Sequence, residues 1–179
     1  MRILITGGAG FVGSNLALGF KAQNAACEVV VLDNLRRRGS ELNLPNLKRR
    51  GVGFIHGDIR HASDLDDLPG NFDLLIEASA EPSVQAGLDG SPQYVLQTNL
   101  TGTLNFAVTE NATRFEIADA QTLSGISRQG IAENFATHLP RSFYSATKLA
   151  SEMMVQEYVD SYGLRAAPAP TFLDNNQTN

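Results

Sequence analysis

The sequence predicts an α/β fold built on a doubly wound parallel sheet, and three observations lead to this prediction. The chain opens with a short apolar run, a glycine-rich turn and a segment that carries apolar residues at helical spacing. Further short apolar runs then alternate with helical segments, which is the pattern of right-handed strand–helix–strand crossovers. The length of 179 residues, with 42% hydrophobic residues, is that of one domain with a substantial core.

The N-terminal stretch predicts a dinucleotide site. Residues 3–5 suit a strand that is buried on both faces, and three glycines follow it at intervals of three. Such glycines permit a tight turn, a close approach of the backbone to a pyrophosphate, and close packing of a helix on a strand. The N-terminus of that helix offers free N–H groups to phosphates. An ordinary glycine-rich turn is the alternative. The residues assigned to the phosphates are Gly7, Gly10, Phe11, Val12 and Gly13.

The next strands are predicted at residues 28–32, 53–56 and 72–76. Asp33 ends the first of them, where a carboxylate can accept hydrogen bonds from the hydroxyls of an adenine ribose. This carboxylate would repel a 2′-phosphate, so the sequence favours NAD over NADP. An arginine among residues 36–38 could hold such a phosphate, which is the counterargument. The other interpretation of Asp33 is a turn residue at a strand end.

The ends of the third and fourth strands could complete the same site. Asp58 could receive the adenine amino group while Ile59 packs on the ring, although an ordinary turn would have the same spacing. Small side chains at residues 78–80 would leave room for a ribose and a pyrophosphate, and they belong to Ala78, Ser79 and Ala80. Helices are predicted from residue 94 to 108, with Asn99 inside, and over residues 42–50, with an interruption at Pro45.

A second group of chemically useful residues lies on a helix predicted to run from near Ser142 to about Tyr162. Tyr144 and Lys148 are four residues apart, so they share one face of that helix. A lysine ammonium close to a phenol stabilises the phenolate, and such a tyrosine can act as a general acid and base. The pair therefore predicts proton-transfer chemistry, with an ordinary pair on a helix surface as the alternative.

Composition and charge exclude several classes of function. A net charge of −5 argues against nucleic acid or an anionic membrane as a main partner, and the basic clusters at 36–38 and 48–50 are interpreted as solvated faces. The single Cys27 excludes an internal disulfide and fits a reducing compartment. The N-terminus lacks the pattern of a signal peptide, and no apolar run has the length of a membrane span. We therefore expect a cytoplasmic protein, and no group of residues predicts a metal site.

The two motifs together resemble the extended short-chain dehydrogenase/reductase family, which comprises NAD-dependent nucleotide-sugar epimerases and dehydratases. The resemblance covers residues 1 to about 165 and implies a Rossmann-like domain with bound NAD. In such enzymes the cofactor briefly oxidises one sugar carbon. Tyr144 would take the proton of the sugar hydroxyl, while Lys148 would stabilise the phenolate and hold the nicotinamide ribose. The matching residues are Thr6 through Gly13, Asp33, Asn34, Gly57 through Ile59, Asn99, and Tyr144 through Lys148.

Loop sequences narrow the resemblance to the CDP-paratose 2-epimerase subgroup. The similar stretches are residues 32–44, 79–83 and 121–127. The resemblance therefore implies a nucleotide-sugar substrate, specifically a CDP-hexose. It also implies a homodimer formed through the helices that carry Asn99 and Tyr144.

Two departures from the family pattern lead us to expect an incomplete member. Residues 107–116 pass from helix to polar loop, so the family's fifth strand, with its catalytic serine or threonine, is expected to be missing. Ser124 and Ser127 could be mistaken for that residue, although the subgroup pattern places them in the following loop. Prolines at 168 and 170 argue against a strand after the last helix.

The expected organisation is an incomplete NAD-binding domain over residues 1–165 and an irregular polar tail over 166–179, without the C-terminal lobe that binds the sugar in the family. Whether the chain is an enzyme is therefore left open. The alternatives to a nucleotide-sugar epimerase are a catalytically inactive NAD-binding module and a non-functional fragment.

Overall fold

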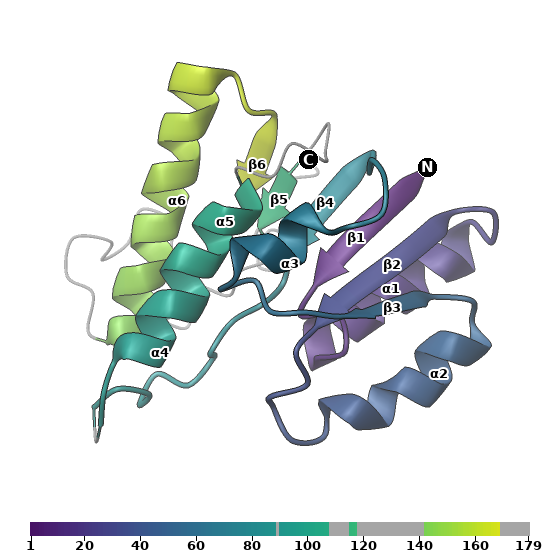
Figure 1. Cartoon of the computed structure of the whole chain (residues 1–179), viewed down its shortest axis with the longest axis horizontal. Helices are drawn as coiled ribbons and strands as arrows, with labels where there is room; N and C mark the ends of the chain where they lie inside the picture. Colours follow the sequence, from purple (N-terminus) through teal and green to yellow (C-terminus); the bar gives the residue numbers. More distant parts are fainter. Residues whose placement is uncertain (89, 108–114, 118–141, 169–179) are drawn as a thin grey trace, which may run out of the picture.

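The computed structural model describes residues 1–88, 90–107, 115–117 and 142–168. These residues form one parallel sheet with the strand order β3-β2-β1-β4-β5-β6 (Figure 1). The order reverses beside β1, as in a doubly wound sheet that binds a nucleotide at that point. The predicted fold class is thus confirmed. The strands are β1 (Arg2–Thr6), β2 (Glu28–Asp33), β3 (Gly53–His56), β4 (Leu74–Glu77), β5 (Phe115–Ile117) and β6 (Ala166–Pro168).

Helices cover both faces of this sheet (Figure 1). Successive side chains of a strand point to opposite faces, so Ile3 and Ile5 pack with helix α1 on one face while Leu4 packs on the other. Both faces of the central strands are buried, which explains their uninterrupted apolar sequence. The helices are α1 (Phe11–Gln23), α2 (Leu44–Arg49), α3 (Ala62–Asp66), α4 (Gln93–Leu96), α5 (Thr103–Ala107) and α6 (Phe143–Tyr162), with a 3-10 turn η1 (Ser40–Asn43) and a π-helical turn η2 (Gln97–Gly102).

Two expectations about the sheet are wrong. A fifth strand is present: β5 pairs in parallel with β4, with Glu77 opposite Ile117. A strand also follows the last helix, because β6 pairs with β5. It lies at the edge of the sheet, where proline is tolerated because only one side of the strand must supply hydrogen bonds. Strands of three residues are too short to give a sequence pattern, which is why both were missed.

The β6 strand takes up the first three residues of the expected polar tail. The rest of that tail, residues 169–179, lies outside the described residues, and so do Ser124 and Ser127.

The helices differ from expectation in two details. Pro45 lies in the first turn of α2 and therefore starts this helix instead of interrupting it. The helix predicted over residues 94–108 runs through α4, η2 and α5, so its middle six residues are π-helical. The last helix is confirmed: a capping box formed by Ser142 and Ser145 begins α6, and Gly163, in the left-handed conformation, ends it.

Candidate functional site

The glycine-rich turn joins β1 to α1 and allows no side chain at two of its positions. A Cβ at Gly7, whose φ is +60°, would lie 2.5 Å from the carbonyl oxygen of Ala78. A Cβ at Gly13 would lie 2.4 Å from the carbonyl oxygen of Gly7, so α1 packs directly on the turn. Gly10 precedes α1 and has no side chain to cap the first turn of the helix. The uncapped N–H groups are the usual donors to a phosphate.

A cavity of about 190 Å³ lies beside this turn, at the carboxyl ends of β1, β2, β3 and β4. Parallel α/β sheets bind ligands at this edge, where the strand order reverses. The predicted site residues that line the cavity are Gly7, Gly10, Asp33, Asn34, Asp58, Ile59, Ala78, Ser79 and Ala80. The described structure thus brings together nine residues from four separate stretches of the chain.

The other predicted cofactor residues do not line the cavity. Gly13 is buried beneath the turn, whereas Phe11 and Val12 begin α1 with largely exposed side chains. Asn99 is fully buried in η2 and forms two hydrogen bonds with the backbone of Glu81. The Glu81 N–H donates to Asn99 Oδ1 at 2.7 Å, and Asn99 Nδ2 donates to the Glu81 carbonyl at 3.2 Å. Asn99 therefore holds the loop after β4 in place, and that loop lines the cavity.

Asp33 holds the glycine turn as well as lining the cavity. Its Oδ2 accepts a hydrogen bond from the Ala9 N–H at 3.0 Å, and its Oδ1 accepts one from the Leu35 N–H at 2.8 Å. Asn43 adds a second link, because its side-chain amide donates to the Ala9 carbonyl at 2.7 Å. Each carboxylate oxygen has a further lone pair, so Asp33 can still accept hydrogen bonds from a ligand hydroxyl.

Asp58 is held by a dense set of charged hydrogen bonds. Arg60 donates to both carboxylate oxygens at 2.6–3.0 Å, and Asn34 Nδ2 donates to Oδ2 at 2.9 Å. Burial by itself raises the pKa of Asp58, but the hydrogen bonds from Arg60 and Asn34 and the positive charge of Arg60 outweigh it. The pKa of this carboxyl therefore lies well below its usual range. Asn105 fastens the same loop by donating to the carbonyls of Ile59 and Arg60.

This arrangement predicts an acid dependence of stability. A carboxyl whose pKa is depressed by folding adds stability at any pH above its unfolded pKa of about 4, and this contribution is lost as the pH falls further. The free energy of unfolding of Asp58→Asn should therefore decrease less below pH ~4 than that of the unsubstituted chain. Denaturant titrations at a series of pH values measure this, with Asp66→Asn, at an exposed position, as the control. Parallel pH profiles for Asp58→Asn and the unsubstituted chain would contradict it.

Several residues of the cavity wall were not predicted as site residues from the sequence, among them Arg36, Tyr94 and Thr98. The Arg36 guanidinium carbon lies 4.1 Å from the centre of the Tyr94 ring, and that of Arg60 lies 5.0 Å from it. Thr98 also lines the cavity, and its hydroxyl oxygen is buried without a hydrogen-bond partner among the described residues. Nothing in the sequence marks Tyr94 or Thr98 apart from their place on the helix of Asn99.

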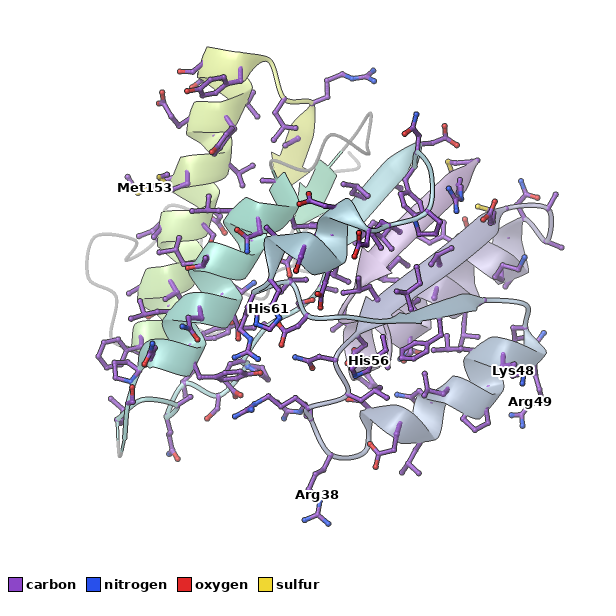
Figure 2. All side chains as sticks on the ribbon, in the orientation of Figure 1. Arg38, Lys48, Arg49, His56, His61 and Met153 are labelled. Carbon is purple, nitrogen blue, oxygen red and sulfur yellow. The ribbon has the colours of Figure 1, made fainter. Side chains whose placement is uncertain are left out.

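The other exposed basic residues fit the interpretation as solvated faces. Figure 2 shows Arg38, Lys48 and Arg49 extending from the surface beside η1 and α2. Arg36 and Arg37 differ from them, because both line the cavity although they are exposed. Two of the three arginines at 36–38 therefore belong to the cavity wall, and for them the interpretation as a solvated face is incomplete.

Tyr144 and Lys148 lie on the buried face of α6, and both are at least nine-tenths buried. The Lys148 ammonium lies 3.9 Å from Oε2 of Glu77, the last residue of β4 and a fully buried carboxylate. Glu77 immediately precedes the cavity-lining residues Ala78–Ala80, so this ion pair connects α6 to the cavity wall. No role for Glu77 follows from the sequence alone.

Two further observations concern metals and membranes. In the described ranges, no three histidine, cysteine, aspartate or glutamate residues are grouped so that they could hold a metal ion. No helix in the same ranges combines the length and apolar character that crossing a membrane requires.

Comparison with known proteins agrees with this geometry. The Haloferax volcanii low-salt glycan biosynthesis protein Agl12 is 33% identical over 168 residues, which are 92% of this chain and 54% of that protein. The CDP-paratose 2-epimerase of Salmonella typhi is 37% identical over 108 residues, or 59% of this chain and 31% of that one. The dTDP-glucose 4,6-dehydratase DesIV of Streptomyces venezuelae, solved with NAD and TYD bound, superimposes with a TM-score of 0.74 at 31% identity, covering 94% of this chain and 54% of that one.

The chain spans about half the length of the first curated relatives it matches. Residues 3–172 match the family described as the NAD dependent epimerase/dehydratase family. This match covers nearly the whole chain, and it agrees with the strand order and with the cavity at the carboxyl edge of the sheet. The chain therefore belongs to the NAD-dependent epimerase/dehydratase family.

Proposed function

We propose that the chain binds NAD at the carboxyl edge of its sheet. The observation that carries this proposal is the convergence of the uncapped glycine turn and the carboxylates of Asp33 and Asp58 on one cavity. The turn offers N–H groups to a pyrophosphate, and Asp33 offers acceptors to ribose hydroxyls. The donor and acceptor types thus fit a dinucleotide.

The size of the cavity indicates which part of a dinucleotide it can hold. Its volume of about 190 Å³ is below the roughly 300 Å³ at which small-molecule pockets begin, so it suits only part of a dinucleotide. We assign the adenosine half to the walls formed by Asp33, Asn34, Asp58 and Ile59. The pyrophosphate would then cross the glycine turn, and the nicotinamide half would extend past Ala78–Ala80 toward α6.

We further propose nucleotide-sugar chemistry of the epimerase or dehydratase type. Bound NAD would supply the hydride acceptor for one sugar carbon. Tyr144 would take the proton from the hydroxyl on that carbon, and the Lys148 ammonium on the next turn of α6 would stabilise the phenolate. The similarity to the Salmonella typhi CDP-paratose 2-epimerase supports a CDP-hexose as the substrate. Dehydratases among the relatives support the same chemistry on other nucleotide sugars.

The homodimer and the cytoplasmic location remain proposals. Apolar side chains are exposed on the helices that carry Asn99 and Tyr144, among them Leu96 on α4, and they support a partner surface. Met153 on α6 is exposed as well (Figure 2).

A titration of the purified chain with NAD⁺, followed by thermal unfolding, tests the binding proposal. A ligand that binds the folded state alone raises the unfolding temperature in a saturable manner. Saturable stabilisation by NAD⁺ without turnover of any nucleotide sugar would favour the inactive NAD-binding module. The absence of saturable stabilisation would overturn both the enzyme and the binding module.

Asp33→Asn tests the assignment of the adenosine half. The amide would place an NH₂ group where a carboxylate oxygen now accepts a backbone N–H, and it would remove the charge that repels a 2′-phosphate. We expect NAD⁺ affinity to fall by about tenfold and NADP⁺ to be discriminated against less strongly. Parallel titrations with both dinucleotides measure this. An unchanged ratio of the two dissociation constants would contradict the assignment.

A further inference from the structure

Glu77 is a charged residue at a position where the surrounding core is apolar. It ends β4, whose other residues are Leu74, Leu75 and Ile76, and its exposed fraction is 0%. Leu75 packs in the same cluster as Phe106 of α5 and Val155 of α6. Since side chains two apart on a strand share a face, Glu77 also points toward α5 and α6. Burying a carboxylate is costly unless a cation and hydrogen bonds compensate it.

Two side chains from different helices supply that compensation. Lys148 of α6, which is 5% exposed, places its ammonium 3.9 Å from Glu77 Oε2. Thr103 of α5 lies with its hydroxyl 3.4 Å from the same oxygen and 3.0 Å from the Asn99 carbonyl. A hydroxyl has one proton, so Thr103 donates to only one of these acceptors at a time. Lys148 is therefore a buried cation within ion-pair distance of Glu77.

The π-helical turn η2 connects this pair to the rest of the cavity wall. The Asn99 carbonyl in η2 accepts hydrogen bonds from Thr103 and from Ser151, which lies one turn of α6 beyond Thr147. Through its side chain, Asn99 also holds the loop at Glu81. The position of α6 relative to β4 is thus fixed by buried polar contacts on both sides of η2.

We propose that Glu77 is a positioning residue that fixes the Lys148 ammonium for the nicotinamide half of the dinucleotide. This inference rests on the proposed binding of NAD. An ammonium carries three donors, and the ion pair with Glu77 engages at most one of them, so the pairing is compatible with donation to a ligand hydroxyl. Glu77 stands directly before Ala78–Ala80, so the carboxylate holds Lys148 where the ligand would leave the cavity.

Binding of NAD⁺ and ADP to Glu77→Gln tests this role. ADP contains the adenosine and both phosphates but no nicotinamide ribose, so it reports on the other half of the site. The glutamine side chain has nearly the same shape as that of Glu77 but carries no charge. We expect NAD⁺ to bind about tenfold more weakly, as for a lost hydrogen bond to a charged group, whereas ADP affinity stays within twofold. The matched control is Glu28→Gln, which removes a carboxylate paired with Arg2 at the opposite edge of the sheet.

A double substitution keeps the test usable if Glu77→Gln folds poorly. Glu77→Leu combined with Lys148→Met replaces the buried ion pair by apolar side chains, an exchange that proteins often tolerate. We expect this variant to unfold cooperatively, to bind ADP normally, and to bind NAD⁺ as weakly as Lys148→Met alone.

The possible outcomes separate the two proposals. Equal weakening of NAD⁺ and ADP in Glu77→Gln, or normal NAD⁺ affinity in the double variant, would overturn the positioning role and leave the NAD site intact. If the unsubstituted chain bound NAD⁺ no more tightly than ADP, the nicotinamide half would add no affinity. The positioning role would then be overturned, while the proposed binding of NAD would stand. Failure of the unsubstituted chain to bind either ligand would overturn the proposed function and this inference with it.

Discussion

Gly13→Ala is expected to abolish saturable NAD⁺ binding. A Cβ at this position would lie 2.4 Å from the Gly7 carbonyl oxygen and 2.6 Å from the Gly8 Cα, and both are backbone atoms of the turn itself. Neither can move aside as a flexible side chain would, so α1 must separate from the turn. The N–H groups at the start of α1 then leave the position from which they would donate to a pyrophosphate. Overpacking of this kind also costs about 1–3 kcal/mol of stability.

The same substitution elsewhere on α1 provides the control. A Cβ at Gly19 meets nothing within 4 Å, so Gly19→Ala should preserve binding and stabilise the helix by up to about 1 kcal/mol. Isothermal titration with NAD⁺ and thermal unfolding of both variants give the comparison. NAD⁺ affinity in Gly13→Ala equal to that of Gly19→Ala would show that the turn is only structural.

The 179-residue chain, assayed alone, is expected to epimerise CDP-paratose at least about a hundredfold more slowly than the Salmonella typhi relative. Remote contacts with a substrate help to orient the reacting carbon, and a misplacement of about 1 Å can cost a hundredfold in rate. The aligned region covers 31% of that relative, so contacts made by the rest of it are not supplied by this region. Tyr144 and Lys148 alone would not replace them.

Product analysis by chromatography after incubation with NAD⁺ and CDP-paratose measures this rate, with the relative assayed in parallel. Tyr144→Phe is the control for residual activity, because a general acid or base contributes roughly 10²–10⁴-fold. Turnover within a hundredfold of the relative that disappears in Tyr144→Phe would prove the expectation wrong and favour a complete enzyme.

The sequence predicted the parts of the fold in which a regular pattern coincides with burial. The apolar runs of β1, β2 and β4 are buried on both faces, and each of these strands lies within two residues of its predicted bounds. β3 has the predicted bounds as well, although its residues at the edge of the sheet are largely exposed. β5 and β6 could not be found this way, because three residues carry no periodicity and Pro168 counts against a strand unless its place at the sheet edge is known. These two strands form because they pair with neighbouring strands of the sheet, and their own sequences do not predict them.

The same distinction applies to the site. Nine predicted cofactor residues line one cavity because strand ends of a parallel sheet meet at one edge. Glu77 was not singled out, because its importance depends on a lysine 71 residues away in the sequence. The contact between Arg36 and Tyr94 was not predicted either. Arg36 lies in a loop and Tyr94 on a distant helix, so no characteristic spacing in the sequence indicates that they meet. Spacing in the sequence does not identify contacts between residues that only the tertiary fold brings together.

The loops at the carboxyl edge are fastened to one another by their own side chains, with a consequence for the energetics of binding. Asn34 joins Asp58, Asn43 joins Ala9, and Asn99 joins Glu81, so the ends of β1, β2, β3 and β4 are tied to neighbouring segments by the protein alone. A ligand that enters a preorganised site loses little affinity to the ordering of loops. The conformational entropy of these loops is lost when the chain folds. Variants that leave these links intact should therefore differ in affinity mainly through the contacts they make to the ligand.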